Sequence, residues 1–149
     1  MRKQTLAVIG NGMVGHRLLE ALAERNLTAR YDVVTFCEEP RPAYDRVHLS
    51  EFFGGTTADE LSLVTPDFFD RTGITCHLGA KAIHVDRDKR QIQLSSGDIV
   101  LYDRLVLATG SYPFVPPIPG NDRGFSFVYR TIEDLEAIRD AGRQSRVGV

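Results

Sequence analysis

The chain has 149 residues, of which 42% are hydrophobic and 26% charged, and its formal net charge at pH 7 is −2. This length and composition are typical of one soluble globular domain, and the small net charge argues against a surface for nucleic acid or anionic membranes. No apolar run approaches the roughly 20 residues that span a bilayer, and the short polar start leaves no room for a cleavable signal, so we expect one cytoplasmic domain over residues 1–149.

A strand and a helix are predicted at the start of the chain. Residues 6–9 form a short apolar run, which is typical of a buried strand. Leucines then recur at helical spacing within a helix that we expect over residues 13–24.

The turn between this strand and this helix carries the sequence Gly10-Asn-Gly12-Met-Val-Gly15. A G-x-G-x-x-G sequence between a strand and a helix is the fingerprint of dinucleotide-binding folds. Gly10 permits the tight turn, Gly12 lets the backbone approach a pyrophosphate, and Gly15 lets the helix pack on the sheet. The backbone amides of Met13 and Val14 complete the predicted phosphate site at the helix N-terminus. A glycine turn without a ligand is the alternative.

A second strand is predicted over residues 32–37, whose continuous apolar run indicates an internal parallel strand. Glu38 follows it directly. A carboxylate at this point of a dinucleotide-binding fold accepts hydrogen bonds from both ribose hydroxyls and disfavours a 2′-phosphate. Glu39 is the neighbouring candidate for the same role, and a solvated acid at a strand end is the alternative for both.

The middle of the chain departs from a simple mononucleotide fold. Residues 40–50 form a long, structured excursion rather than a short loop. A short helix is expected over residues 63–71, beginning at Thr65-Pro-Asp67, and a strand over residues 75–78.

Three further segments alternate apolar and polar residues and are separated by polar turns: 81–85, 91–94 and 99–102. This pattern predicts an antiparallel meander. The apolar residues 104–108 then predict a buried parallel strand.

The last segment predicts a helix over residues 131–141, with Thr131 as its N-cap and Gly142 as its C-terminal stop. Residues 146–149 are typical of a strand that begins a second domain. We therefore expect the chain to be the N-terminal piece of a longer protein, with an NAD(P)-binding domain beginning near residue 146.

The two cysteines, Cys37 and Cys76, each stand at the end of an apolar run. They lack metal-ligand spacing and do not form a Cys-x-x-Cys pair, so we interpret them as small buried hydrophobic residues. No other residue pattern predicts a metal site or a catalytic side chain.

The whole chain resembles the FAD-binding domain of pyridine nucleotide–disulfide reductase-like flavoproteins. The resemblance is carried by the G-x-G-x-x-G turn, by Glu38, by the meander, and by Tyr102-Asp-x-Leu-Val-Leu-Ala-Thr-Gly110-Ser-x-Pro113. It implies an α/β, Rossmann-like FAD/NAD(P)-binding fold, with a parallel sheet flanked by helices and by an antiparallel meander.

Within that superfamily, Glu39-Pro-Arg-Pro-Ala-Tyr-Asp-Arg-Val-His-Leu-Ser50 is similar to a segment of the large subunit of assimilatory NAD(P)H-dependent nitrite reductases. Such enzymes pass electrons from NAD(P)H through FAD to an iron–sulfur cluster and siroheme, where nitrite becomes ammonia. The resemblance implies that FAD binds to this chain, whereas NAD(P)H, the cluster and siroheme bind elsewhere in the enzyme. The implied partners are the remainder of the chain and a small subunit, with neither nucleic acid nor membrane among them.

Two alternatives stay open. Ferredoxin and rubredoxin reductases carry a related loop, but Glu51 stands here where that loop has a lysine. Disulfide reductases, by contrast, carry a redox-active Cys-x4-Cys pair early in the chain, and this sequence has no such pair. A nucleotide-binding sensor without turnover uses the same fold.

The resemblance also implies further cofactor-binding residues. Ala82 corresponds to a position at the adenine, and Thr109 and Gly110 to the turn against the flavin. Arg46 and His48 are candidates for contact with the pyrophosphate or the isoalloxazine, with a surface arginine and a packed histidine as the alternatives. Because a second domain completes the flavin site in such enzymes, we expect the 149-residue chain by itself to hold FAD weakly or not at all.

Overall fold

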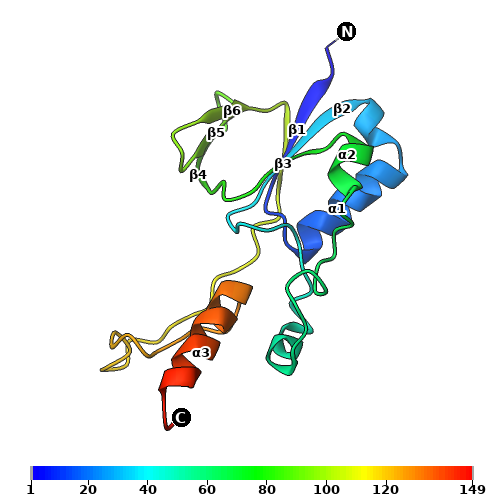
Figure 1. Ribbon diagram of the computed structural model, residues 1–149. Helices are drawn as coiled ribbons and strands as arrows, with labels where there is room; N and C mark the ends of the chain where they lie inside the picture. The colour runs from blue at the N-terminus through cyan, green and yellow to red at the C-terminus, as the bar shows by residue number, and fades with distance from the viewer. Residues whose placement is uncertain (1, 149) are drawn as a thin grey trace. The chain divides into compact units, whose positions relative to one another are not determined.

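The computed structural model describes residues 2–148 (Figure 1). It divides into two compact units, each with buried apolar side chains of its own. The first unit comprises the chain up to Tyr44 together with Ser62–Gly110, and the second comprises Asp45–Leu61 together with the chain from Ser111 onward.

A four-stranded parallel sheet forms the centre of the first unit. Its order is β3-β2-β1-β7, and the strands are β1 (Gln4–Ile9), β2 (Tyr31–Phe36), β3 (Thr75–His77) and β7 (Arg104–Leu107). All three pairings are parallel. The carboxyl ends of β1 and of its two neighbours therefore meet at one edge, where α/β proteins bind ligands.

Helices cover one face of this sheet. They are α1 (Met13–Glu24), which has the bounds predicted from the leucine spacing, and the short α2 (Phe68–Thr72), with the 3₁₀ segment η1 (Leu27–Ala29) after α1. The buried core on this face consists of Leu6, Val8, Leu19, Leu22, Val33, Phe68 and Ile74.

An antiparallel meander covers the other face, as predicted (Figure 1). Its strands are β4 (Ala82–Asp86), β5 (Gln91–Leu94) and β6 (Ile99–Leu101). Their apolar residues Ile92 and Leu94 are buried with Ala7, Ile9 and Phe36 of the parallel sheet. The predicted α/β class, with a parallel sheet between helices and a meander, is confirmed.

The second unit contains the 3₁₀ segment η2 (Leu49–Gly54) and the helix α3 (Ile132–Gln144). Thr131 caps α3 as predicted: its Oγ1 accepts the Asp134 amide at 3.1 Å, and the Asp134 carboxylate accepts the Thr131 amide at 2.8 Å. The Arg139 guanidinium lies 5.0 Å from the ring centroid of Phe52, which helps to fix α3 on η2.

Two predicted helices have different ends in the structure. Helix α2 begins at Phe68 rather than near residue 63, because the Leu63 amide donates 3.0 Å to the Ala43 carbonyl and holds that residue in extended backbone. Helix α3 continues past Gly142 to Gln144, so Gly142 is not its stop.

Two predictions about strands are wrong. β7 is parallel as expected but is not buried: it lies at the edge of the sheet, and Leu107 is 65% exposed. Residues 146–148 form no strand, and residue 149, the last of that prediction, lies outside the described residues.

Neither cysteine is in a disulfide; Cys37 is buried and Cys76 half-buried. Within residues 2–148, no helix is both long and apolar enough to cross a bilayer. The same residues contain no group of three or more His, Cys, Asp or Glu side chains that could hold a metal ion.

Candidate functional site

The corner between β1 and α1 is packed backbone against backbone. Gly10 has φ +107°, and a Cβ there would overlap the carbonyl oxygen of Ala108. A Cβ on Gly15 would overlap the carbonyl oxygen of Gly10 and lie 3.6 Å from the Ala108 side chain. The Gly10 amide donates to Phe36 of β2, and the Ala108 amide to Ile9 of β1, at 2.9 and 2.8 Å. Only glycine fits at positions 10 and 15.

Gly12 is different, because a Cβ added there would meet no protein atom within 4 Å. It is the N-cap residue of α1, no side chain caps this helix, and its first turn contains no acidic residue. The first amides of a helix lack partners inside the helix and carry partial positive charge. The structure therefore leaves a side-chain-free slot, with uncapped amides of Met13 and Val14, where a pyrophosphate fits.

Glu38 follows β2 at the same edge of the sheet. Its carboxylate accepts a 2.7 Å hydrogen bond from the ammonium group of Lys81, and both side chains are nearly half exposed. Such an exposed pair contributes at most about 1 kcal/mol, so ribose hydroxyls can compete for the carboxylate. Glu39, the other candidate, is bonded instead to the Tyr44 hydroxyl at 2.7 Å.

Three other predicted cofactor-binding residues also belong to the first unit. The Thr109 backbone lies beside the glycine corner, since a Cβ on Gly10 would come within 3.1 Å of the Thr109 amide nitrogen. Ala82 begins β4 and is half-buried. Thr109 and Gly110 follow β7 and are exposed. Gly110 has φ +67°, which fits the predicted turn at that strand end.

Arg46 and His48 belong to the second unit. A guanidinium nitrogen of Arg46 donates to the Arg130 carbonyl at 2.7 Å. His48 is exposed rather than packed, and its Nδ1 lies 2.7 Å from the Asp45 carboxylate. This hydrogen bond raises the pKa of His48, with a further contribution from the charge of Asp45 and of Glu51.

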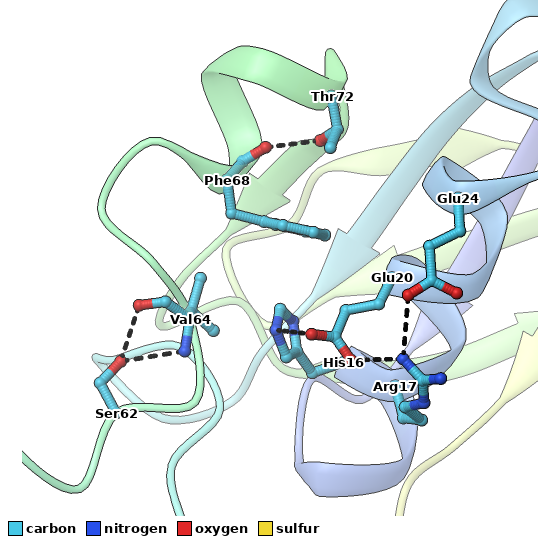
Figure 2. A network of polar contacts seen from close by, with 8 residues as sticks. All are labelled: His16, Arg17, Glu20, Glu24, Ser62, Val64, Phe68 and Thr72. Carbon is cyan, nitrogen blue, oxygen red and sulfur yellow. Dashed lines mark hydrogen bonds and ion pairs between the residues drawn. The ribbon is translucent and has the colours of Figure 1, made fainter. Parts of the chain in front are cut away.

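His16, in the second turn of α1, is buried against α2 (Figure 2). Its ring meets Phe68 edge to face with centroids 4.8 Å apart, and its Nε2 lies 3.8 Å from the Glu20 carboxylate. Burial lowers the pKa of His16 and outweighs the opposing effect of Glu20. A cavity of about 400 Å³ lies beside this histidine, but none of its lining residues belongs to the glycine-rich turn.

Two polar residues of the site were not predicted. Lys81 pairs with Glu38 because the backbone bond from Ala80 to Cys37 holds the two segments together, and no local sequence pattern indicates that pairing. Asn11 occupies a variable position of the glycine motif, yet its side chain is 97% buried and donates to Cys76 at 3.4 Å.

The amino-acid sequence is similar to curated proteins over nearly its whole length. It is 53% identical over 148 residues to the nitrite reductase (NADH) large subunit of Escherichia coli K12 and 48% identical over 149 residues to the nitrite reductase [NAD(P)H] large subunit of Klebsiella oxytoca. These matches cover 99% and 100% of this chain but only 18% and 16% of the relatives. The chain therefore spans less than a fifth of either protein.

Solved structures share the fold. Putidaredoxin reductase, in its covalent complex with putidaredoxin, matches with a TM-score of 0.79 and 28% identity, over 95% of this chain and 34% of that one. NADH:rubredoxin oxidoreductase from Clostridium acetobutylicum matches with a TM-score of 0.84 over 96% of this chain and 36% of that one, and at 20% identity it supports the fold alone.

The resemblance inferred from the motifs is confirmed by a family model that matches residues 4–149. The glycine corner, the parallel sheet and the meander are the structural counterparts of that match. The chain belongs to the pyridine nucleotide-disulphide oxidoreductase family.

Proposed function

We propose that the chain is the FAD-binding part of an NAD(P)H-dependent nitrite reductase large subunit. One observation carries the proposal: Gly10 and Gly15 lock the corner at the head of α1, whereas Gly12 leaves an open slot in front of uncapped amides. That combination suits a diphosphate group, which needs close approach to the backbone and several N–H donors. The relatives at 53% and 48% identity support the choice of enzyme.

In this proposal the chain's own residues bind and orient the cofactor. The amides of Met13, Val14 and Gly15 donate to the pyrophosphate, and the Glu38 carboxylate exchanges Lys81 for the ribose hydroxyls. The bound FAD would supply the redox chemistry, which is hydride uptake from NAD(P)H and onward electron transfer. No side chain of this chain is assigned as an acid, a base or a nucleophile.

The remaining parts of the reaction belong to the rest of such an enzyme. The matched relatives extend far beyond the 149 residues, which cover 18% and 16% of them. We assign the NAD(P)H site, the iron–sulfur cluster, siroheme and the contact with a small subunit to that remainder.

The test is a titration of the full-length protein, freed of its cofactor, with FAD, followed by quenching of flavin fluorescence. We expect Gly12→Val to weaken binding by about 100-fold or more, because the side chain occupies the slot. Gly142→Val is the matched control. A Cβ added to Gly142 would also meet no protein atom within 4 Å, but this glycine lies in α3. Glu38→Ala should cost roughly 1.5–3 kcal/mol of binding free energy, the usual loss for a charged hydrogen bond. Equal FAD affinities for the unchanged chain and Gly12→Val would contradict the assignment.

A second candidate function is that of a ferredoxin-reductase-like flavoprotein. It is favoured by the structural match to putidaredoxin reductase at 28% identity. The two candidates differ in the electron acceptor. With NADH as the donor, the full-length protein should reduce nitrite under the first candidate and a rubredoxin or ferredoxin under the second. Binding of NADH without any flavin would instead support a sensor.

A further inference from the structure

Asn11 stands between the two glycines that carry the site, and its side chain points into the protein. It is 97% buried, and its Nδ2 donates to the Cys76 sulfur at 3.4 Å. Cys76 is the middle residue of β3, two strands away from β1 in the sheet. This contact joins the glycine-rich turn to a distant strand.

The surroundings of Asn11 are polar but incompletely hydrogen-bonded. Its Oδ1 is buried without a hydrogen-bond partner among the described residues. The same holds for the hydroxyl of Thr35, which is the register partner of Cys76 across β2 and β3. Partners in a parallel ladder project side chains to the same face, so Asn11, Cys76 and Thr35 lie together under the turn.

A buried amide with an unmet acceptor lowers stability relative to an apolar side chain of similar size. The position of Asn11 therefore calls for a role other than stability.

The glycine-rich turn is fixed at both of its ends but not between them. The Gly10 amide is bonded to Phe36 on one side, and helix α1 begins at Met13 on the other. Between these two anchors the backbone passes through Gly12. A Cβ added to Gly12 would meet no protein atom within 4 Å, and the residue has the wide conformational freedom of glycine. The side chain of Asn11 supplies the bond that ties this stretch to the sheet.

We propose that Asn11 is a positioning residue, which holds the glycine-rich turn in its phosphate-accepting conformation by tying it to Cys76. The proposal rests on the function proposed above. Asn11 acts through the backbone of Gly12, which orients the amides of Met13 and Val14 toward the pyrophosphate. Loss of the tie lets the turn sample other conformations, so that binding must first restore the competent one.

The experiment compares Asn11→Leu, which keeps the size but removes the amide, with Thr35→Val, which removes the neighbouring hydroxyl without touching the turn. Three quantities are measured for each: the FAD affinity of the full-length protein, the thermal midpoint of the cofactor-free 149-residue chain, and the backbone NMR order parameters of Gly12 and Met13 in that chain. We expect Asn11→Leu to bind FAD about five- to tenfold more weakly and to lower these order parameters, with an unchanged or higher thermal midpoint. Thr35→Val should change neither the affinity nor the order parameters.

A second variant tests the proposal if Asn11→Leu does not fold. Cys76→Ala removes the acceptor and leaves Asn11 in place, so it should also weaken FAD binding. The double variant should lose no more than Asn11→Leu alone, because both remove one contact. FAD affinity of the full-length Asn11→Leu protein within twofold of the unchanged protein, together with unchanged order parameters at Gly12 and Met13, would overturn the proposal.

The readouts separate this proposal from the one on which it rests. Failure of the unchanged full-length protein to bind FAD counts against the proposed function alone. In that case the order parameters of Gly12 and Met13 in the cofactor-free variants still decide whether Asn11 holds the turn.

Discussion

The glycine corner makes a quantitative prediction for Gly15→Ala. An added methyl group would overlap the carbonyl oxygen of Gly10 and also contact the Ala108 side chain at 3.6 Å. Gly10 has no room to move aside, because its amide is bonded to Phe36 and even a Cβ on Gly10 would overlap the Ala108 carbonyl. The strain therefore falls on backbone atoms, and α1 must shift away from the sheet.

Two effects set the size of the change. Overpacking of a tight site costs typically 1–3 kcal/mol, and the absence of any flexible side chain puts this site at about 3 kcal/mol. Replacing a helical glycine by alanine returns about 1 kcal/mol through helix propensity. The free energy of unfolding should fall by about 2 kcal/mol, which moves a urea midpoint by about 1 M when the denaturant slope is about 2 kcal/mol per molar.

The assay is urea unfolding followed by far-ultraviolet circular dichroism. Gly142→Ala is the control, because this glycine is also helical and has open space around it. It should raise the midpoint, or leave it unchanged, through propensity alone. A Gly15→Ala chain whose midpoint equals or exceeds that of the unchanged chain would refute the packing argument.

Three further predictions concern ionisable groups and the α3 cap. Burial lowers the pKa of His16 below its unfolded value of 6.5, so the chain should lose stability as the pH falls from about 6.5, with the loss complete below the folded pKa. Between pH 7.5 and pH 5, the free energy of unfolding should fall less for His16→Asn than for the unchanged chain. Identical pH profiles for the two chains would contradict this account. Asp45 raises the pKa of His48, so Asp45→Asn should lower the pKa measured from the imidazole NMR shifts, and an unchanged titration would count against the pair. Thr131→Ala removes the hydroxyl of the capping box and should cost about 1 kcal/mol in urea unfolding, whereas an unaltered midpoint would exclude a role for that cap.

The elements that carry the site could be predicted from the sequence because their signals are local. The glycine spacing, the leucines of α1 and the apolar run of β2 determine a strand–turn–helix–strand unit without information from the rest of the chain. The meander was predictable for the same reason, since each strand alternates within itself and is bounded by polar turns.

The predictions that failed depend on distant neighbours. An apolar run does not reveal whether a strand is internal or at an edge, so the exposure of Leu107 could not be read from residues 104–108. Gly142 has the residue type of a helix stop, yet α3 continues because the glycine has no positive φ and the next residues keep the helical bonds. The Asn11–Cys76 contact joins residues 65 positions apart and likewise has no local signature.

Main-chain atoms, rather than side-chain rotamers, determine the shape of the corner between Gly10, Gly15 and Ala108. Under the proposed function, a dinucleotide would meet a preorganised surface at this corner and would immobilise few additional degrees of freedom there. Surface substitutions around this corner can alter charge and solubility without reshaping it.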